Sequence, residues 1–251
     1  MKKIILQTLL QTLVAIVFLV MVWAYLYFAT ANELLVPSLF DSMMKMRALL
    51  ASGVFWVGLG MSVLRALSAF AISFVFALIL SVIAYLVPSF ARFFAPIVSA
   101  LRSLPVLAVL LILLSVLGAS EAPVAVAFLS LFPMLYTAIL NALMEINSDV
   151  IDISRVHGAS IFHCVFYIYL PLSAPSILRE VGATLSFSLK VIVSAEVLAN
   201  TAKSLGGMMQ EAKIYAEMPQ LFALVFITFL LGLLFELSLS LVATAVEKRV
   251  K

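Results

Sequence analysis

The stretch Asn147–Pro175, NSDVIDISRVHGASIFHCVFYIYLPLSAP, is the longest interval between apolar segments that gathers several charged and polar residues together. Asp152 falls in the first turns of a predicted short helix, where a carboxylate favours the positive end of the helix dipole. Gly158 can end that helix, and a second short helix over 161–169 is predicted to stop before Pro171. The pattern predicts a helix, a turn and a helix that form an exposed docking element between two membrane spans. An ordinary polar loop with a stray glycine and proline is the alternative.

The composition of the chain indicates an integral membrane protein. Hydrophobic residues make up 65% of the 251 residues and charged residues only 11%, with a mean hydropathy of +1.25. Soluble domains have about half apolar and about a quarter charged residues, so a soluble domain could not bury this much apolar surface. The spans are expected to be helices, because lipid offers no water to an open backbone. The single Cys164 excludes an internal disulfide.

Apolar runs of roughly 20 residues predict about six transmembrane helices in an all-α fold. The predicted spans are 9–28, 61–87, 97–117, 124–143, 177–198 and 221–244, and Pro105 is expected to kink the third. Residues 32–53 mix charges with apolar residues and suit an amphipathic segment at the membrane interface. The chain therefore divides into an N-terminal unit, 1–54, and a core transmembrane unit, 55–251. A cleaved signal peptide is the alternative for the first span. The apolar run of this span is longer than the apolar region of a signal peptide, which is usually about 7–15 residues long.

The distribution of basic residues predicts that both termini lie in the cytoplasm. With this orientation the cytoplasmic side holds eight basic residues, namely Lys2, Lys3, Arg92, Arg155, Arg179, Lys248, Arg249 and Lys251. The other side holds four, namely Lys45, Arg47, Lys203 and Lys213. Cytoplasmic loops carry the excess of lysine and arginine, so the 147–175 loop is predicted to be cytoplasmic. The net charge of +3 reflects these loops rather than a surface for nucleic acid.

The 147–175 loop resembles the EAA motif of ABC importer permeases, in which E-A-A, three residues and G-A-S are followed after about ten residues by L-P. Here Asp152-Ile153-Ser154 stands for E-A-A, and Gly158-Ala159-Ser160 and Leu170-Pro171 match the rest. Further segments are similar to the permeases for nitrate, sulfonates and taurine. These segments are Trp56–Phe70, Leu101–Pro105, Ala195-Glu196, Ser204–Gly206 and the last span with its basic tail.

The resemblance implies the permease subunit of a type I, MetI-like ABC importer in the inner membrane of a bacterium. Such a subunit pairs with a second permease copy, with ATP-binding cassette ATPase subunits and with an extracytoplasmic solute-binding protein. ATP and its Mg would be bound by the ATPase, and this chain would need no cofactor. The residues that the resemblance assigns to ATPase coupling are Asp152, Ser154, Arg155, Gly158, Ala159, Leu170 and Pro171.

Three departures from the motif concern the docking of the ATPase. Ile153 and Ser154 replace small alanines that face tight packing, so we expect a partner groove adapted to the bulkier Ile153. Asp152 keeps the charge of the usual glutamate with a shorter reach.

The chain lacks G-x4-G-K-[ST], whose backbone N–H groups and lysine hold nucleotide phosphates. It is therefore predicted to be no enzyme, with ATP hydrolysis left to a separate chain.

Charged residues inside predicted spans are functional candidates because charge at membrane depth is costly. Lys190 and Glu196 are predicted to lie on the solute path, with Glu236 as an alternative structural partner for Lys190. They lie on different faces of the fifth span, so a direct pair between them is not expected. Arg65 and Arg102 are near span ends, and snorkelling to the membrane surface is the favoured interpretation. The histidines, His157 and His163, are too isolated for a metal site.

Two other functions compete with the importer subunit. A secondary transporter or channel would need coupling carboxylates or broken half-helices near the midplane, which only Lys190 and Glu236 approach. An intramembrane enzyme lacks support because no HExxH, GxSxG or paired aspartates occur within spans. The solute stays undetermined, although Lys190 favours an anionic one.

Overall fold

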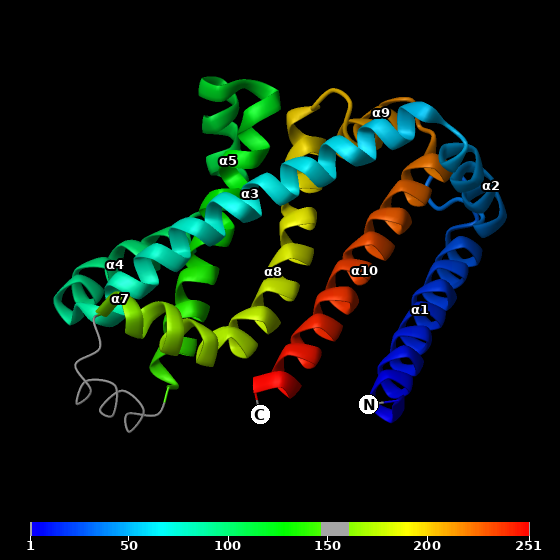
Figure 1. Ribbon diagram of the computed structural model, residues 1–251. Helices are drawn as coiled ribbons and strands as arrows, with labels where there is room; N and C mark the ends of the chain where they lie inside the picture. Colours follow the sequence, from blue (N-terminus) through cyan, green and yellow to red (C-terminus); the bar gives the residue numbers. More distant parts are fainter. Residues whose placement is uncertain (1, 147–160, 251) are drawn as a thin grey trace.

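The computed structural model describes the backbone of residues 2–146 and 161–250 as a bundle of long helices with no strand in these ranges (Figure 1). Its helices are α1 (Lys2–Thr30), α2 (Leu39–Leu50), α3 (Gly53–Leu86), α4 (Pro88–Ser103), α5 (Val106–Met144), α7 (Ile161–Cys164), the π-helical turn η1 (Val165–Tyr169), α8 (Leu170–Ala199), α9 (Leu205–Ile214) and α10 (Met218–Val250). The all-α membrane fold predicted from the sequence is confirmed.

Five helical segments of the described chain are long and apolar enough to cross a membrane. They are Leu13–Thr30, Gly53–Leu86, Val106–Met144, Val165–Ala199 and Met218–Ser238. The prediction of about six separate spans is wrong in one detail, because the third predicted span is not a continuous helix. Its first part belongs to α4, and its second part shares α5 with the fourth predicted span.

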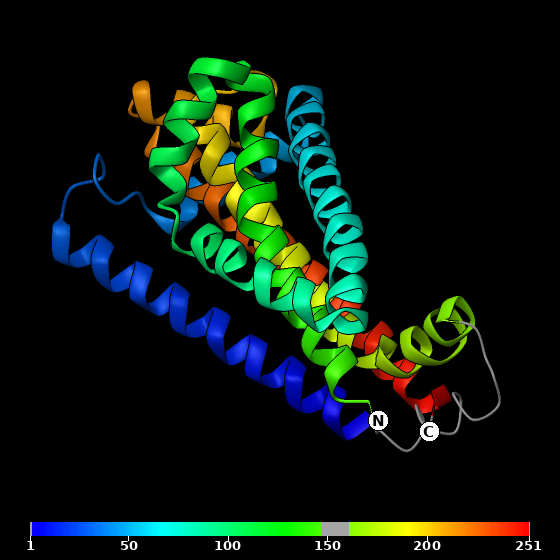
Figure 2. The ribbon, with the colours of Figure 1, turned by 90° about the vertical axis from the view of Figure 1, so that its left-hand side faces the viewer.

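Pro105 and Gly118 explain this rearrangement. Pro105 disfavours helical geometry at the preceding residue, and Leu104 is extended (φ −64°, ψ 129°). The expected kink is therefore a complete break between α4 and α5. Gly118 has φ 76° and ψ 175°, a conformation that side chains disfavour, and there the chain reverses within α5. The first half of α5 follows directly after α4 in the chain, and the second half runs back beside the first. Figures 1 and 2 show these two halves side by side and antiparallel.

The two ends of the bundle carry different elements. The start of α1 and the end of α10 lie at one end, and α2 and α9 lie at the other (Figure 1). The end of α5 lies at the same end of the bundle as the two chain termini, whereas the turn within α5 lies at the same end as α9 (Figures 1 and 2). The predicted interfacial segment 32–53 contains α2, which Ser38 caps by accepting a hydrogen bond from the Asp41 N–H at 3.0 Å.

The centre of the bundle forms around a row of small residues on α3. The buried positions include Gly58, Ser62, Ala66, Ala69, Ser73, Ala77, Ser81 and Ala84, spaced three or four apart. Small side chains let helix backbones approach closely inside a membrane. Two of these contacts are hydrogen bonds across helices: Ser81 Oγ donates to the Tyr136 carbonyl on α5, and Ser188 Oγ on α8 donates to the Ala66 carbonyl. This row fixes α3 against α5 and α8.

The helix over 161–169 does not stop before Pro171, which corrects the sequence prediction. Instead α7, η1 and α8 form one uninterrupted helical stretch from Ile161 to Ala199. In η1 the Leu170 N–H bonds the Val165 carbonyl five residues earlier. This wider turn accommodates Pro171, which has no N–H to donate, as the second residue of α8. Leu170 and Pro171 are therefore helical, whereas the predicted coupling residues Asp152, Ser154, Arg155, Gly158 and Ala159 lie outside the described residues.

Candidate functional site

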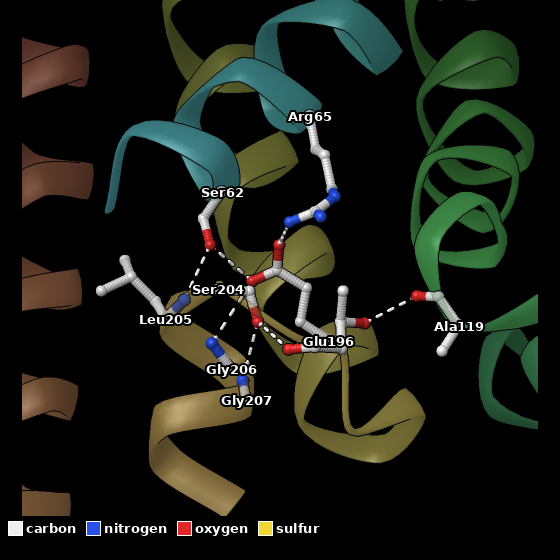
Figure 3. A network of polar contacts seen from close by, with 9 residues as sticks. Ser62, Arg65, Ala119, Glu196, Ser204, Leu205, Gly206 and Gly207 are labelled. Atoms are coloured by element: carbon white, nitrogen blue, oxygen red, sulfur yellow. Dashed lines mark hydrogen bonds and ion pairs between the residues drawn. The ribbon is translucent and has the colours of Figure 1, made fainter. Parts of the chain in front are cut away.

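A buried carboxylate, Glu196, forms the centre of the most connected polar site that the structure describes. Glu196 is fully buried and lies near the end of α8. One oxygen, Oε1, lies 2.9 Å from Nη1 of Arg65 on α3, and the other, Oε2, accepts a 2.6 Å hydrogen bond from Ser62 Oγ. The backbone N–H of Gly206 donates to the same Oε2 at 3.3 Å. Figure 3 shows the carboxylate enclosed between α3 and the start of α9.

The start of α9 supplies N–H groups to this site. Ser204 caps the helix by accepting from the Gly207 N–H at 2.8 Å, and the Leu205 N–H donates to Ser62 Oγ at 2.9 Å (Figure 3). The first N–H groups of a helix have no partners inside it and carry partial positive charge. The carboxylate of Glu196 therefore meets a helix N-terminus as well as a guanidinium. We name Ser62, Arg65, Glu196 and residues 204–207 the Glu196 cluster.

A tight backbone approach makes the cluster possible. Asn200 ends α8 in the left-handed conformation (φ 48°, ψ 48°), which turns the chain back towards α3. Gly206 then lies against α8 so closely that an added Cβ would be 2.5 Å from Val197 N and 2.6 Å from the Val193 carbonyl oxygen. Only glycine fits at 206, and its lack of a side chain brings the N–H within reach of Glu196.

A second link joins this region to the turn in α5. Pro123 has no N–H, which leaves the Ala119 carbonyl without the donor that a helix normally provides four residues later. The hydroxyl of Thr201 donates to that carbonyl at 2.8 Å (Figure 3). Four elements therefore meet here: α3, α5, α8 and α9. Their junction holds this end of the bundle together.

The structure separates Lys190 from Glu196. Glu196 pairs with Arg65, so the snorkelling interpretation of Arg65 is wrong: its side chain is only 10% exposed. Arg102 is exposed, and its Nη2 donates to the Pro133 carbonyl at 3.3 Å. The contacts of Glu196 with Ser62 and Arg65 could not be predicted because these two side chains are 134 and 131 residues away in the chain. Ser204 was a local signal, since serine is a favoured residue at the start of a helix.

Lys190 is exposed on α8 and borders a groove of about 240 Å³ between α8 and the start of α5. The groove is lined by Val106, Leu107, Leu110, Phe187, Lys190 and Ser194, among others. Among the described residues, Lys190 has no ion-pair partner, and the alternative pairing with Glu236 is not formed. A lysine with no counter-ion among the described residues therefore borders a largely apolar groove.

Comparisons with known proteins place this fold. The helical fold is shared with solved structures of ABC transporters. The inward-facing MetNI methionine ABC transporter aligns with a TM-score of 0.67 and 21% identity over 76% of this chain and 97% of that chain. A crystal structure of an amino acid ABC transporter with histidines aligns with a TM-score of 0.63 and 19% identity over 76% and 94%. These likenesses confirm the MetI-like fold.

The sequence comparisons give the family. The family model described as "Binding-protein-dependent transport system inner membrane component" matches residues 83–251, more than half of the chain, and the chain belongs to this family. A probable ABC transporter permease protein of Brucella melitensis biotype 1 is 31% identical over 55% of this chain and 56% of that protein. The glycine betaine/proline betaine permease ProW of Escherichia coli K12 is 27% identical over 45% of this chain and 32% of that protein. The chain thus spans about half or less of the length of these curated relatives.

Proposed function

We propose that this chain is the transmembrane permease subunit of an ATP-driven ABC importer. The observation that carries the proposal is the family match over 83–251, which includes the whole 147–175 loop with its EAA-like motif. In this proposal ATP and Mg are bound by a separate ATPase, because the chain has no phosphate-binding loop of its own. A second permease copy and an extracytoplasmic binding protein complete the assembly in the inner membrane, with both termini in the cytoplasm.

The geometry of α8 supports a role for the loop in coupling. The uninterrupted helix from Ile161 to Ala199 joins the end of the 147–175 loop to the Glu196 cluster at the opposite end of the bundle. A displacement of the loop by an ATPase would thus be transmitted along one element. The predicted coupling residues are Asp152, Ser154, Arg155, Gly158, Ala159, Leu170 and Pro171. The last two belong to the helix, where they would receive the motion.

We assign Lys190 to the solute path. It is a described cation that borders a largely apolar groove and has no ion-pair partner among the described residues, so a solute with an anionic group would find its partner there. Nitrate, sulfonates and taurine, the solutes of the permeases that the sequence resembles, all carry such a group. Glu196 has both oxygens engaged inside the Glu196 cluster, so we assign it to holding α3, α8 and α9 together beside that path.

Co-purification of the tagged chain from membranes in mild detergent tests the coupling proposal. We expect an ATP-binding cassette ATPase to be retained with the wild type and lost with Gly158→Asp and with Asp152→Lys. Gly53→Asp is the matched control: an added Cβ at Gly53 meets nothing within 4 Å, and its end of α3 lies far from the termini. If no ATPase is retained in any mild detergent, the importer proposal is wrong and a secondary transporter becomes the better hypothesis.

Solute uptake into proteoliposomes containing the whole assembly tests Lys190. Lys190→Met should reduce uptake at least tenfold while Lys190→Arg retains much of it, because only the second keeps the charge. Equal uptake by wild type and Lys190→Met, at equal protein level, would remove Lys190 from the path and leave the permease proposal intact.

A further inference from the structure

One face of α4 carries polar side chains that the rest of the chain leaves exposed. Arg92, Ser99 and Ser103 lie in one line along this helix, seven and four residues apart, and Arg102 lies at the edge of the same face. All four residues are exposed. On the opposite face the ring of Phe94 contacts an aromatic ring of α5, with 5.3 Å between the centroids. We name the four polar residues the α4 stripe.

The guanidinium of Arg102 lies at membrane depth. Its Nη2 donates to the Pro133 carbonyl of α5 at 3.3 Å. Pro133 is about 22 Å of helix from Gly118, where α5 turns, and about 16 Å from Met144, where α5 ends. A charged side chain at such a depth almost always faces protein or a water-filled path rather than lipid. Among the described residues Arg102 has no carboxylate partner, and a guanidinium has further N–H groups to donate.

Arg102 and Lys190 lie on the same side of the bundle. Arg102 borders a hollow of about 190 Å³, and Val106 and Phe187 line both this hollow and the groove beside Lys190. A shared wall therefore separates two cations that have no ion-pair partner among the described residues. From Arg102 the α4 stripe continues to Arg92, about 15 Å of helix closer to the end of the bundle that holds the chain termini (Figure 1).

We propose that the α4 stripe lines the half of the solute path nearer the chain termini, and that Arg102 receives the anionic group of the solute after Lys190. This inference rests on the importer function proposed above. A small oxyanion such as a nitrate or sulfonate group fits this order, because a guanidinium offers parallel N–H donors to two oxygens whereas an ammonium acts as a point charge. The Ser99 hydroxyl is a weaker, uncharged donor further along, and transport requires binding that is weak enough for release.

Cysteine reactivity tests whether water and anions reach the α4 stripe. Cys164 is the only cysteine, so Ser99→Cys in a Cys164→Ser background introduces a single thiol. The full chain in freeze–thawed membranes, which admit reagents from both sides, is treated with sulfonatoethyl methanethiosulfonate, an anion, or with its trimethylammonium analogue, a cation. We expect both to react. Relative to a free thiol, the anion should be favoured roughly threefold or more, because the two arginines of the stripe attract it.

Ile97→Cys in the same background is the matched control. Ile97 is 39% exposed at about the same depth as Ser99, but it lies on the other side of α4, so it should react with neither reagent. No reaction at Ser99→Cys, or equal reaction at the two positions, would overturn the proposal. This comparison leaves Arg102 unchanged, so it does not depend on the folding of an Arg102 variant.

Two further variants test Arg102 itself in the Ser99→Cys background. Arg102→Gln should remove most of the preference for the anionic reagent, and Arg102→Lys should restore much of it; a preference that Arg102→Gln leaves unchanged would refute the role of Arg102. Retention of the ATPase on co-purification is measured for each variant. A retained ATPase without reaction at Ser99→Cys refutes the α4 stripe alone. An anion preference without any retained ATPase keeps the anion path and assigns it to a secondary transporter.

Discussion

Replacing Gly206 by alanine should disrupt the packing of the Glu196 cluster. The new Cβ would lie 2.5 Å from Val197 N and 2.6 Å from the Val193 carbonyl oxygen, where ordinary contacts begin at 3.4 Å. Both atoms are backbone of α8, so no side chain can rotate away. We therefore expect α9 to move from α8 by about 0.8–0.9 Å, the difference between these distances.

That displacement determines the magnitude of the effect. The hydrogen bond from Gly206 N–H to Glu196 Oε2 is already 3.3 Å long, so the shift takes it beyond hydrogen-bonding distance. Losing a hydrogen bond to a charged group costs roughly 1.5–3 kcal/mol, and overpacking costs roughly 1–3 kcal/mol. Together they should lower the free energy of unfolding by roughly 3–5 kcal/mol. For a chain of this size that is a fall in Tm on the order of 10 °C.

The assay is thermal unfolding in detergent, read as the fraction of monodisperse protein that remains on gel filtration after heating. Gly60→Ala is the matched control, because Gly60 is an exposed helical glycine of α3 and an added Cβ there meets nothing within 4 Å. Its Tm should stay the same or rise slightly, since alanine favours a helix by roughly 1 kcal/mol over glycine. Equal Tm values for Gly206→Ala and wild type would refute the close packing of α9 on α8.

The same assay tests two further links of this region. Glu196→Gln should lower the free energy of unfolding by roughly 3–5 kcal/mol because it leaves the Arg65 charge buried without its partner. The double variant Glu196→Gln with Arg65→Met should lower it by less than the two single changes added together. Additive losses would show that the two side chains are not coupled. Thr201→Val should cost roughly 1–2 kcal/mol because the Ala119 carbonyl loses its donor. In a Pro123→Ala background a backbone N–H can satisfy that carbonyl, so the same change should cost less there; an equal cost in both backgrounds would contradict this explanation.

The sequence predicted what depends on composition and on local spacing. Apolar runs give the helical membrane class, which the structure confirms. The mixed charges of residues 32–53 predict an amphipathic segment, and this segment contains α2. These features require no knowledge of distant parts of the chain, since each is determined within a few turns of helix.

The details that sequence reasoning missed are those in which a local rule has two outcomes. Proline before or within a helix can end it or be accommodated: Pro105 separates two helices, whereas Pro171 is tolerated because η1 widens the turn before it. A charged residue near a span end can snorkel or pair inside the fold. Arg65 pairs, but only because folding brings Glu196, 131 residues later, to the same place. Tertiary contacts decide between these outcomes.

The arrangement of α8 limits how a displacement of the 147–175 loop could act. Near one end, the Glu196 cluster ties α8 to α3 and α9, and at the centre Ser186 Oγ donates to the Gly232 carbonyl of α10 at 3.0 Å. Lys190 lies between these two points, about 9 Å along the helix from Glu196. A helix held at one end responds to a push at the other by tilting, so displacement should decrease from Pro171 towards Glu196. We therefore expect the groove beside Lys190 to move less than the loop, and loosening of the cluster by Gly206→Ala to spread motion into α9.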